Sequence, residues 1–159
     1  MKVAIFMGSK SDLPVVRKAA DLLKEFGIDC TMRITSAHRT HSRTMELVRS
    51  MEQQGAEVFI ACAGGAAHLP GVIAALTTVP VIGVPILGNA FNGMDSLLSI
   101  VQMPKGIPVA TVGVDATENA AVLAAQILSL QDKELRSKLE KYRSKMENKV
   151  IEDDKNITL

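Results

Sequence analysis

Short apolar runs alternate with amphipathic segments along most of the chain. Five runs that suit buried strands lie at residues 3–7, 30–34, 58–61, 81–84 and 109–112. Apolar positions recur at helical spacing between and after them, at about 13–26, 44–54, 69–76, 94–101 and 118–130. Continuous apolar runs are typical of parallel strands buried on both faces, and strands that alternate with helices form βαβ units. The pattern therefore predicts an α/β fold around a parallel sheet.

The ends of the first two predicted helices support this division. Gly27 and Gly55 follow the last apolar positions of these helices, where a left-handed glycine commonly ends a helix. A chain of 159 residues is most simply one domain with a substantial core. Right-handed crossovers then favour a single flavodoxin-like domain with three layers, which we assign to residues 1–131.

The chain changes character from residue 132 onward. Leu135, Leu139, Tyr142, Met146 and Val150 form a narrow apolar stripe on a highly charged helix. A stripe this narrow cannot build a core by itself, so it lies either across the parent domain or on another subunit. Packing between subunits is the favoured alternative, and residues 153–159 are expected to form a loose tail. Residues 132–159 are thus predicted to be an extra C-terminal helix and tail.

Composition narrows the class of function. Hydrophobic residues make up 47% of the chain, charged residues 22%, and the net charge is +1, so nothing favours a nucleic-acid or membrane partner. No run approaches the roughly 20 apolar residues of a membrane span. Aromatic residues make up only 3% of the chain, which leaves few rings to stack on a flavin. The two cysteines lie apart in sequence, which fits a cytoplasmic protein better than a disulfide scaffold.

The first loop with candidate chemistry, Gly8-Ser9-Lys10-Ser11-Asp12, joins the first predicted strand to the first helix. Gly8 permits a tight turn, and hydroxyl groups with free amides at a helix start can hold an anion such as phosphate. Asp12 has the wrong charge for phosphate, but it suits the hydroxyls of a sugar or the cap of the helix. A simple capped turn explains the segment equally well.

The second loop, Ser36-Ala37-His38-Arg39-Thr40, follows the second predicted strand. Arg39 offers a planar fork of donors that suits a phosphate or a carboxylate. His38 is a candidate for proton transfer, because the charge of a histidine can change near neutral pH. The alternative is a polar loop in which Thr40 or Ser42 caps the next helix.

The third loop, Ala63-Gly64-Gly65-Ala66-Ala67-His68-Leu69-Pro70-Gly71, follows the third predicted strand. Its small residues let the backbone approach a ligand closely and present N–H donors. His68 either contacts a substrate or satisfies backbone groups at the start of a helix, and both alternatives stay open here. Because the carboxyl ends of parallel strands meet at one edge of the sheet, a ligand site is expected there.

Other features carry less chemistry. Residues 88–93 form a loop before Asp95 and Ser96, which suit a helix start at least as well as a ligand contact. No cluster of cysteines, histidines and carboxylates has the spacing of a zinc site. The chain also lacks the glycine-rich loops of nucleotide-binding proteins and the nucleophile elbow of hydrolases. Acid–base chemistry without an obvious metal or cofactor remains.

Four segments together resemble the PurE family of purine biosynthesis, whose class I members are N5-carboxyaminoimidazole ribonucleotide mutases. These segments are GSKSD at 8–12, SAHRT at 36–40, AGGAAHLPG at 63–71 and DSLLSIVQMPKGIPVAT at 95–111. They follow one another in the family's order over nearly the whole chain. The resemblance implies a flavodoxin-like domain assembled as a homo-octamer, with active sites shared between neighbouring subunits. It also implies a ribonucleotide substrate, no metal and no organic cofactor.

The resemblance further implies a reaction in which a carboxylate moves from the exocyclic nitrogen of an aminoimidazole ribonucleotide to carbon 4 of the ring, through a trapped CO2. His38 would move the proton, and the backbone from Gly64 to Ala67 would close around the carboxylate or CO2 together with His68. Ser9, Ser11 and Arg39 would hold the phosphate, and Asp12 the ribose hydroxyls. The expected catalytic residues are His38 and His68, and the expected substrate-binding residues are Gly8, Ser9, Ser11, Asp12, Ser36, Arg39, Gly64, Gly65 and Ala66.

Two positions depart from the pattern of the mutases. This chain has His41 where mutases usually have a proline, and its loop at residues 88–93 also differs. A sister class, class II, carboxylates aminoimidazole ribonucleotide directly with CO2 and lacks the Gly-Gly-Ala-Ala-His run that this chain carries at 64–68. The mutase is therefore the favoured hypothesis. Direct carboxylation and a non-catalytic nucleotide-binding module are the alternatives.

Overall fold

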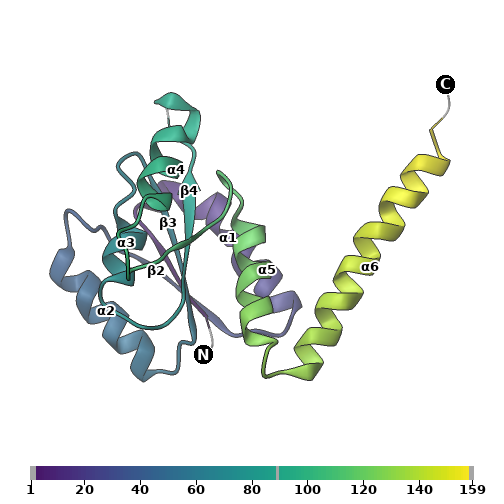
Figure 1. Cartoon of the computed structure of the whole chain (residues 1–159), viewed down its shortest axis with the longest axis horizontal. Coiled ribbons are helices and arrows are strands. Elements are labelled where there is room, and N and C mark those ends of the chain that lie inside the picture. The colour runs from purple at the N-terminus through teal and green to yellow at the C-terminus, as the bar shows by residue number, and fades with distance from the viewer. Residues whose placement is uncertain (1–2, 89, 158–159) are drawn as a thin grey trace.

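The computed structural model describes residues 3–88 and 90–157, and a parallel sheet lies at the centre of the domain (Figure 1). Its five strands are β1 (Val3–Met7), β2 (Cys30–Ile34), β3 (Val58–Gly64), β4 (Val81–Ile86) and β5 (Ala110–Thr111). They are ordered β2-β1-β3-β4-β5, and every neighbouring pair is parallel. This is the flavodoxin-like order, so the predicted fold class is confirmed.

Helices cover both faces of the sheet, which gives the three predicted layers (Figure 1). Side chains of β1 show the alternation: Val3, Ile5 and Met7 join one core cluster, whereas Ala4 and Phe6 join the other. The first cluster is closed by α1 (Leu13–Glu25) and α5 (Thr117–Leu128), and the second by α2 (His41–Gln53), α3 (Leu69–Ala74) and α4 (Met94–Val101). Burial on both faces explains why the strands appear in the sequence as continuous apolar runs.

Element boundaries differ from the predicted ones where the sequence has small or polar residues. Strand β3 continues past residue 61 because Cys62, Ala63 and Gly64 pair in register with β4. Helix α2 begins at His41, three residues before the predicted start. The prediction missed its first turn because that turn is polar and carries no apolar period. Strand β5 is shorter than the predicted 109–112. Gly27 and Gly55 have φ values of +78° and +82°, as predicted for residues that end helices.

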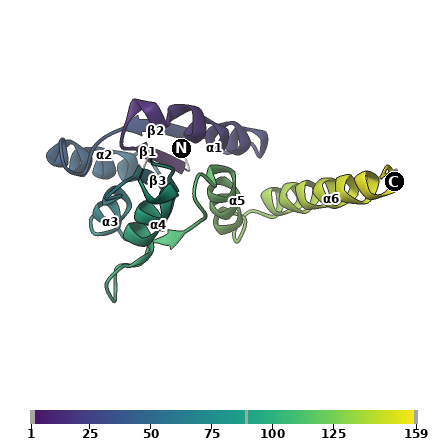
Figure 2. The same ribbon diagram turned by 90° about the horizontal axis from the view of Figure 1, so that it is seen from above.

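The C-terminal helix α6 (Lys133–Lys155) starts on the domain and then leaves it (Figure 2). The carboxylate of Asp132 caps it by accepting the Leu135 N–H at 3.0 Å. Leu135 and Leu139 are buried in the cluster that contains α1 and α5, whereas Met146 and Val150 are 47% and 68% exposed. The loose tail predicted from residue 153 is wrong for residues 153–155, because the helix continues to Lys155 without a glycine or proline to interrupt it. Residues 158–159 of that prediction lie outside the described residues.

None of the helices in the part of the chain that the structure describes is both long enough and apolar enough to cross a membrane.

Candidate active site

The loops that follow β1, β2 and β3 enclose a cleft of about 470 Å³ at the carboxyl ends of these three adjacent strands. This is the edge where the sequence predicted a ligand site. The residues that line the cleft are Gly8, Ser9, Asp12, Ser36, Ala37, His38, Arg39, Ala63, Gly64, Ala67, His68 and Leu69.

The first loop turns its polar groups toward one another. The hydroxyl of Ser9 accepts the Ser11 N–H at 3.2 Å and caps the short 3₁₀ helix η1 (Lys10–Asp12). The Ser11 hydroxyl lies 2.8 Å from the Ser9 hydroxyl and 3.0 Å from a carboxylate oxygen of Asp12. Asp12 occupies the cap position of α1 but makes no side-chain capping bond, so that alternative for Asp12 is wrong. Its carboxyl group is left at the cleft.

Three threonines fix the second loop. The buried Thr35 hydroxyl lies 3.1 Å from the Thr40 hydroxyl and 2.8 Å from the Thr44 hydroxyl. The Ser36 N–H donates to the Thr40 hydroxyl at 2.9 Å. Buried polar groups are costly unless they are hydrogen-bonded, so this network holds the loop in one conformation. Thr40 occupies the predicted cap position of α2 but makes no side-chain capping bond.

Arg39 links the first two loops. Its Nη2 donates to the Gly8 carbonyl at 3.5 Å, and its Nε donates to the Ser36 hydroxyl at 3.4 Å. Both distances are long, so these bonds are weak. A guanidinium has five N–H donors in a planar fork, which leaves Arg39 able to bind an anion in the cleft.

The third loop has an unusual backbone. Gly65 and Ala67 have φ values of +61° and +36°, in the region that favours glycine. An alanine there is strained, at a cost on the order of 1 kcal/mol. A Cβ atom added to Gly64 would lie only 3.3 Å from the Ile86 carbonyl oxygen on β4. The sharp turn carries the chain from β3 to His68, which occupies the cap position of α3 without a side-chain capping bond.

The two candidate histidines are in direct contact. The Nε2 atom of His38 lies 2.7 Å from the Nδ1 atom of His68, and the two ring planes cross at 78°. His38 comes from the loop after β2 and His68 from the loop after β3, so β1 lies between their strands. Both side chains are exposed at the cleft. The sequence indicated each histidine separately but not the hydrogen bond between them.

The cleft brings together most of the residues predicted from the sequence. The predicted site residues that line it are Gly8, Ser9, Asp12, Ser36, His38, Arg39, Gly64 and His68. Ser11, Gly65 and Ala66 do not line it, although each is the chain neighbour of a residue that does. Ala67, whose backbone was expected to close around the carboxylate or CO2, also lines the cleft. The lining residues that were missed are Ala37, Ala63 and Leu69; they lie within the motifs but carry no polar group that would signal a site.

Gly88, which follows β4 at the start of the loop at residues 88–93, lies near the third loop. A Cβ atom added to Gly88 would lie 4.0 Å from the Gly65 nitrogen. Asn89 of this loop lies outside the described residues. At the far end of the loop, the buried Ser96 hydroxyl donates to the carbonyls of Ile86 and Gly93. This favours a structural role for Ser96 over a ligand contact.

Cys62 lies on β3, directly before the third loop, and is buried. Burial raises the pKa of its thiol far above the usual range, and the charges of Asp12 and Asp115 add to the effect. A thiol held neutral is a poor nucleophile, which favours a structural role for Cys62. Within the described residues, no group of three or more histidines, cysteines and carboxylates is placed to hold a metal ion.

Comparison with known proteins gives consistent results. Residues 2–149 match the family model for AIR carboxylase. The chain is 61% identical over 145 residues to the N5-carboxyaminoimidazole ribonucleotide mutase of Pyrococcus abyssi, covering 91% of this chain and 83% of that protein. It is 52% identical over 151 residues to the Thermotoga maritima protein of that name, covering 95% and 88%. A crystal structure of Treponema denticola PurE superposes with a TM-score of 0.90 at 35% identity, covering 99% and 98% of the two chains.

Proposed function

Because the chain belongs to the AIR carboxylase family, we propose that its cleft converts N5-carboxyaminoimidazole ribonucleotide into 4-carboxy-5-aminoimidazole ribonucleotide. The reaction is an isomerisation in purine biosynthesis. The observation that carries the proposal is the contact between His38 and His68 inside the cleft, since the reaction needs a group that can both give and take a proton.

The substrate is held by groups on the first two loops. Arg39 binds the phosphate together with the hydroxyls of Ser9 and Ser11, and Asp12 accepts hydrogen bonds from the ribose hydroxyls. Ser11 contributes from the edge, because its hydroxyl is turned toward Ser9 and Asp12. The link between Arg39 and the Gly8 carbonyl supports this assignment, since it places the cation beside the turn that carries the serine hydroxyls. Ser36 supports Arg39 from the second loop.

The chemistry takes place in two steps. In the first, His38 gives its proton to the exocyclic nitrogen of the substrate while the bond from that nitrogen to the carboxylate breaks and CO2 forms. In the second, carbon 4 of the ring attacks the CO2, the new carbon–carbon bond forms, and the neutral His38 takes the proton from carbon 4. The proton returns to the residue that gave it, so the cycle needs no external acid or base.

The third loop keeps the CO2 in place between the steps. Backbone N–H groups at Gly64, Gly65 and Ala66 are presented by a turn with positive φ angles, which supports their use as donors to a carboxylate or CO2. His68 stands at the end of the same loop. Trapping is effective because a held reactant reaches effective concentrations on the order of 10⁵ M in well-oriented cases. Released CO2 would be diluted instead.

Assembly into a homo-octamer, with active sites shared between neighbouring subunits, is part of the proposal. Met94, Leu98 and Val101 lie along one exposed side of α4, at 50%, 52% and 48% exposure. An apolar row of this kind on a helix is typical of an interface. We divide the chain into a catalytic domain at 1–131 and a C-terminal segment at 132–159 that packs between subunits.

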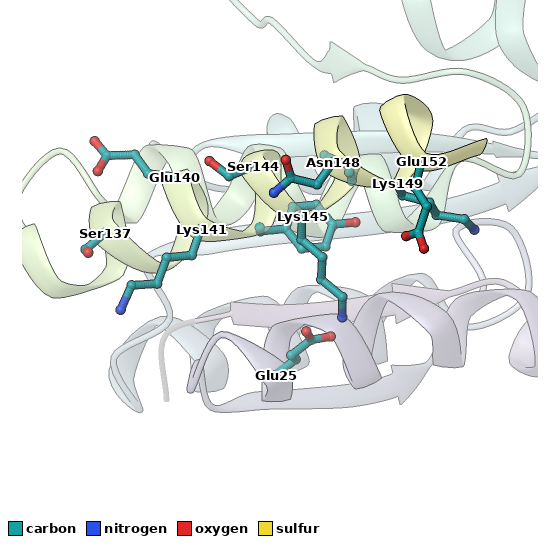
Figure 3. A pocket seen from close by; sticks show the side chains of 11 residues that line it. Glu25, Ser137, Glu140, Lys141, Ser144, Lys145, Asn148, Lys149 and Glu152 are labelled. Atoms are coloured by element: carbon teal, nitrogen blue, oxygen red, sulfur yellow. The ribbon is translucent and has the colours of Figure 1, made fainter. Parts of the chain in front are cut away.

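The outer half of α6 supports that division. A groove of about 900 Å³ lies along it, beside the end of α1. Figure 3 shows Lys141 and Lys145 extending from α6 toward that end of α1, where Glu25 stands. With Met146 and Val150 exposed, this part of the helix presents apolar and charged groups to a neighbour. Light scattering on the purified protein tests the octamer directly, and a monomer mass would contradict it.

We place the protein in the cytoplasm. Cys30 and Cys62 are both free thiols in the described chain, which supports a reducing compartment.

A parallel assay tests the reaction. One tube contains the protein with N5-carboxyaminoimidazole ribonucleotide, and the other contains it with aminoimidazole ribonucleotide and bicarbonate. We expect rapid formation of the 4-carboxy product in the first tube only. Rapid product in the second tube only would identify a direct carboxylase, and product in neither would leave a nucleotide-binding module.

A further inference from the structure

We infer that His68 is a positioning residue, whose hydrogen bond to Nε2 of His38 leaves Nδ1 of His38 to exchange the proton with the substrate in both steps. The inference rests on the proposed function for the role of His38 in proton transfer. It rests on the structure for the role of His68, because Nε2 of His38 and Nδ1 of His68 are 2.7 Å apart.

A hydrogen bond between two ring nitrogens needs a proton on one nitrogen and a lone pair on the other. When both rings are neutral, they carry two protons in total, and one of these lies between the rings. Adding one proton gives a singly charged pair in which both outward nitrogens are protonated and the shared proton stays. A second added proton would put hydrogens on both facing nitrogens and break the bond. The intact pair therefore takes up one proton, not two.

The contact also decides which atom of His38 does the chemistry. Its Nε2 is committed to His68 for as long as the bond lasts, so Nδ1 is the nitrogen that remains for the substrate. In the charged pair Nδ1 carries a proton and is the acid of the first step. After that proton has left, the shared proton stays on Nε2, and the free lone pair of Nδ1 is the base of the second step. His68 thus keeps the same atom of His38 available for both steps.

His68 is held in place by its own loop. His68 follows Ala67, whose φ is +36°, and precedes Leu69 and Pro70, which are both buried. Its side chain makes no capping bond to α3, and among residues 3–88 and 90–157 its ring is hydrogen-bonded to His38 alone. The His38 loop is fixed separately by the hydroxyl of Thr35. Two rigid loops therefore set the geometry of the pair.

Two further side chains with titratable or charged groups share the cleft with the two rings. They are Arg39 from the second loop and Asp12 from the first.

The test uses the small number of histidines in the chain, which are His38, His41 and His68. Nuclear magnetic resonance of the intact, substrate-free protein with nitrogen-15 in its histidine rings reports the tautomer and the protonation of each ring. Between pH 5 and 8 we expect His38 and His68 to change together and to take up one proton between them. His41 is exposed at the start of α2, so H41N is a control that should leave both signals unchanged. Independent uptake of one proton by each ring would overturn the inference.

Two substitutions of His68 distinguish a role in positioning His38 from a role in filling space. H68N keeps a carbonyl oxygen near the place of Nδ1 and can still accept a hydrogen bond from His38, whereas H68L cannot. We expect kcat to fall at least about tenfold in H68L, with a changed pH profile and a nearly unchanged KM, and to recover to within about threefold of the unchanged protein in H68N. Equal losses in the two variants, with the His38 signals unaltered, would contradict the positioning role.

The two kinds of measurement also separate the inference from the proposed function. The proton count is made without substrate, so it holds whatever reaction the cleft catalyses. If the two rings share one proton but the protein does not convert N5-carboxyaminoimidazole ribonucleotide, the proposed function is contradicted and the inference about the histidine pair stands. If the protein is fully active but each ring takes up its own proton, the inference is contradicted and the proposed function stands.

Discussion

The cleft and the outer half of α6, which carries Met146 and Val150, differ in how many of their side chains find partners within the same chain. At the cleft, Ser9 and Asp12 each share a hydrogen bond with the neighbouring Ser11. Arg39 bonds across two loops, and the two histidines bond to each other. On α6, the apolar stripe is buried only while the helix lies on its own domain, and it then continues into solvent. The polar groups of the cleft thus find partners within one chain, whereas Met146 and Val150 on α6 have exposed side chains.

The largest expected effect is in the cleft. Changing His38 to Asn removes the proton-transferring ring and should lower kcat at least ~10²-fold, which is the lower end of general acid–base contributions. H41N is the matched control, because His41 does not line the cleft. The measurement is the rate with N5-carboxyaminoimidazole ribonucleotide. Unchanged activity in H38N would remove His38 from the mechanism.

The next effect is in assembly. Changing Met146 and Val150 to Lys places charges on the exposed part of the stripe. Burying each of these side chains is worth about 1.5 kcal/mol or more, so two losses should weaken a subunit contact at least about 100-fold. Light scattering over a range of concentrations checks this. E147K is the control, since Glu147 is exposed and lies outside the groove and the stripe. An unchanged mass in the double variant would show that the outer half of α6 is not an interface.

The inner half of α6 should behave as core. Leu139 is 8% exposed within the cluster that includes α1 and α5, so L139A should lower the free energy of unfolding by about 2 kcal/mol. L130A is the matched control, because Leu130 is 74% exposed, and its cost should stay below about 0.5 kcal/mol. Urea denaturation measures both. Equal costs would mean that α6 does not start on its own domain in solution.

The smallest effect concerns the buried thiol of Cys62 on β3. The pKa of the Cys62 thiol is raised by burial above the ordinary value of 9.0, so the folded protein keeps a proton there that the unfolded chain loses. This contribution to stability is complete below pH 9.0 and is lost above it, by up to about 1.4 kcal/mol per pH unit.

Denaturation at pH 8 to 10 checks the sign of that effect. C62A should flatten the alkaline decline relative to the unchanged protein. C30A is the matched control, and it should flatten the decline less, because Cys30 is only partly buried. Parallel declines in the unchanged protein and C62A would show that water reaches the thiol.

Much of the fold could be predicted because the apolar pattern of each buried strand can be recognised within its own short segment of sequence. Runs such as residues 3–7 are apolar throughout, and buried parallel strands require that pattern. The prediction ended β3 at residue 61 because Cys62, Ala63 and Gly64 are small and occur in loops as readily as in strands. Their pairing with β4 is a tertiary fact that the sequence of β3 does not contain.

The candidate site could be predicted by residue type but not by contact. His38, Arg39 and His68 stood out because each follows a predicted strand, and strand ends converge at one edge of a parallel sheet. The bond between His38 and His68 depends on the paths of two loops, one of them bent by the positive φ of Ala67. No pattern in the sequence signals that an alanine adopts such an angle. The same holds for Ser11, whose hydroxyl turned toward Ser9.

A carbon label tests the central claim, that the cleft moves a carboxylate without releasing it. N5-carboxyaminoimidazole ribonucleotide with carbon-13 in its carboxylate is converted in a single turnover, in buffer that holds an excess of unlabelled bicarbonate. If the third loop traps CO2 beside His38, nearly all of the label should appear in the carboxylate on carbon 4 of the product. Product that carries unlabelled carboxylate from the buffer would contradict trapping and identify a direct carboxylase.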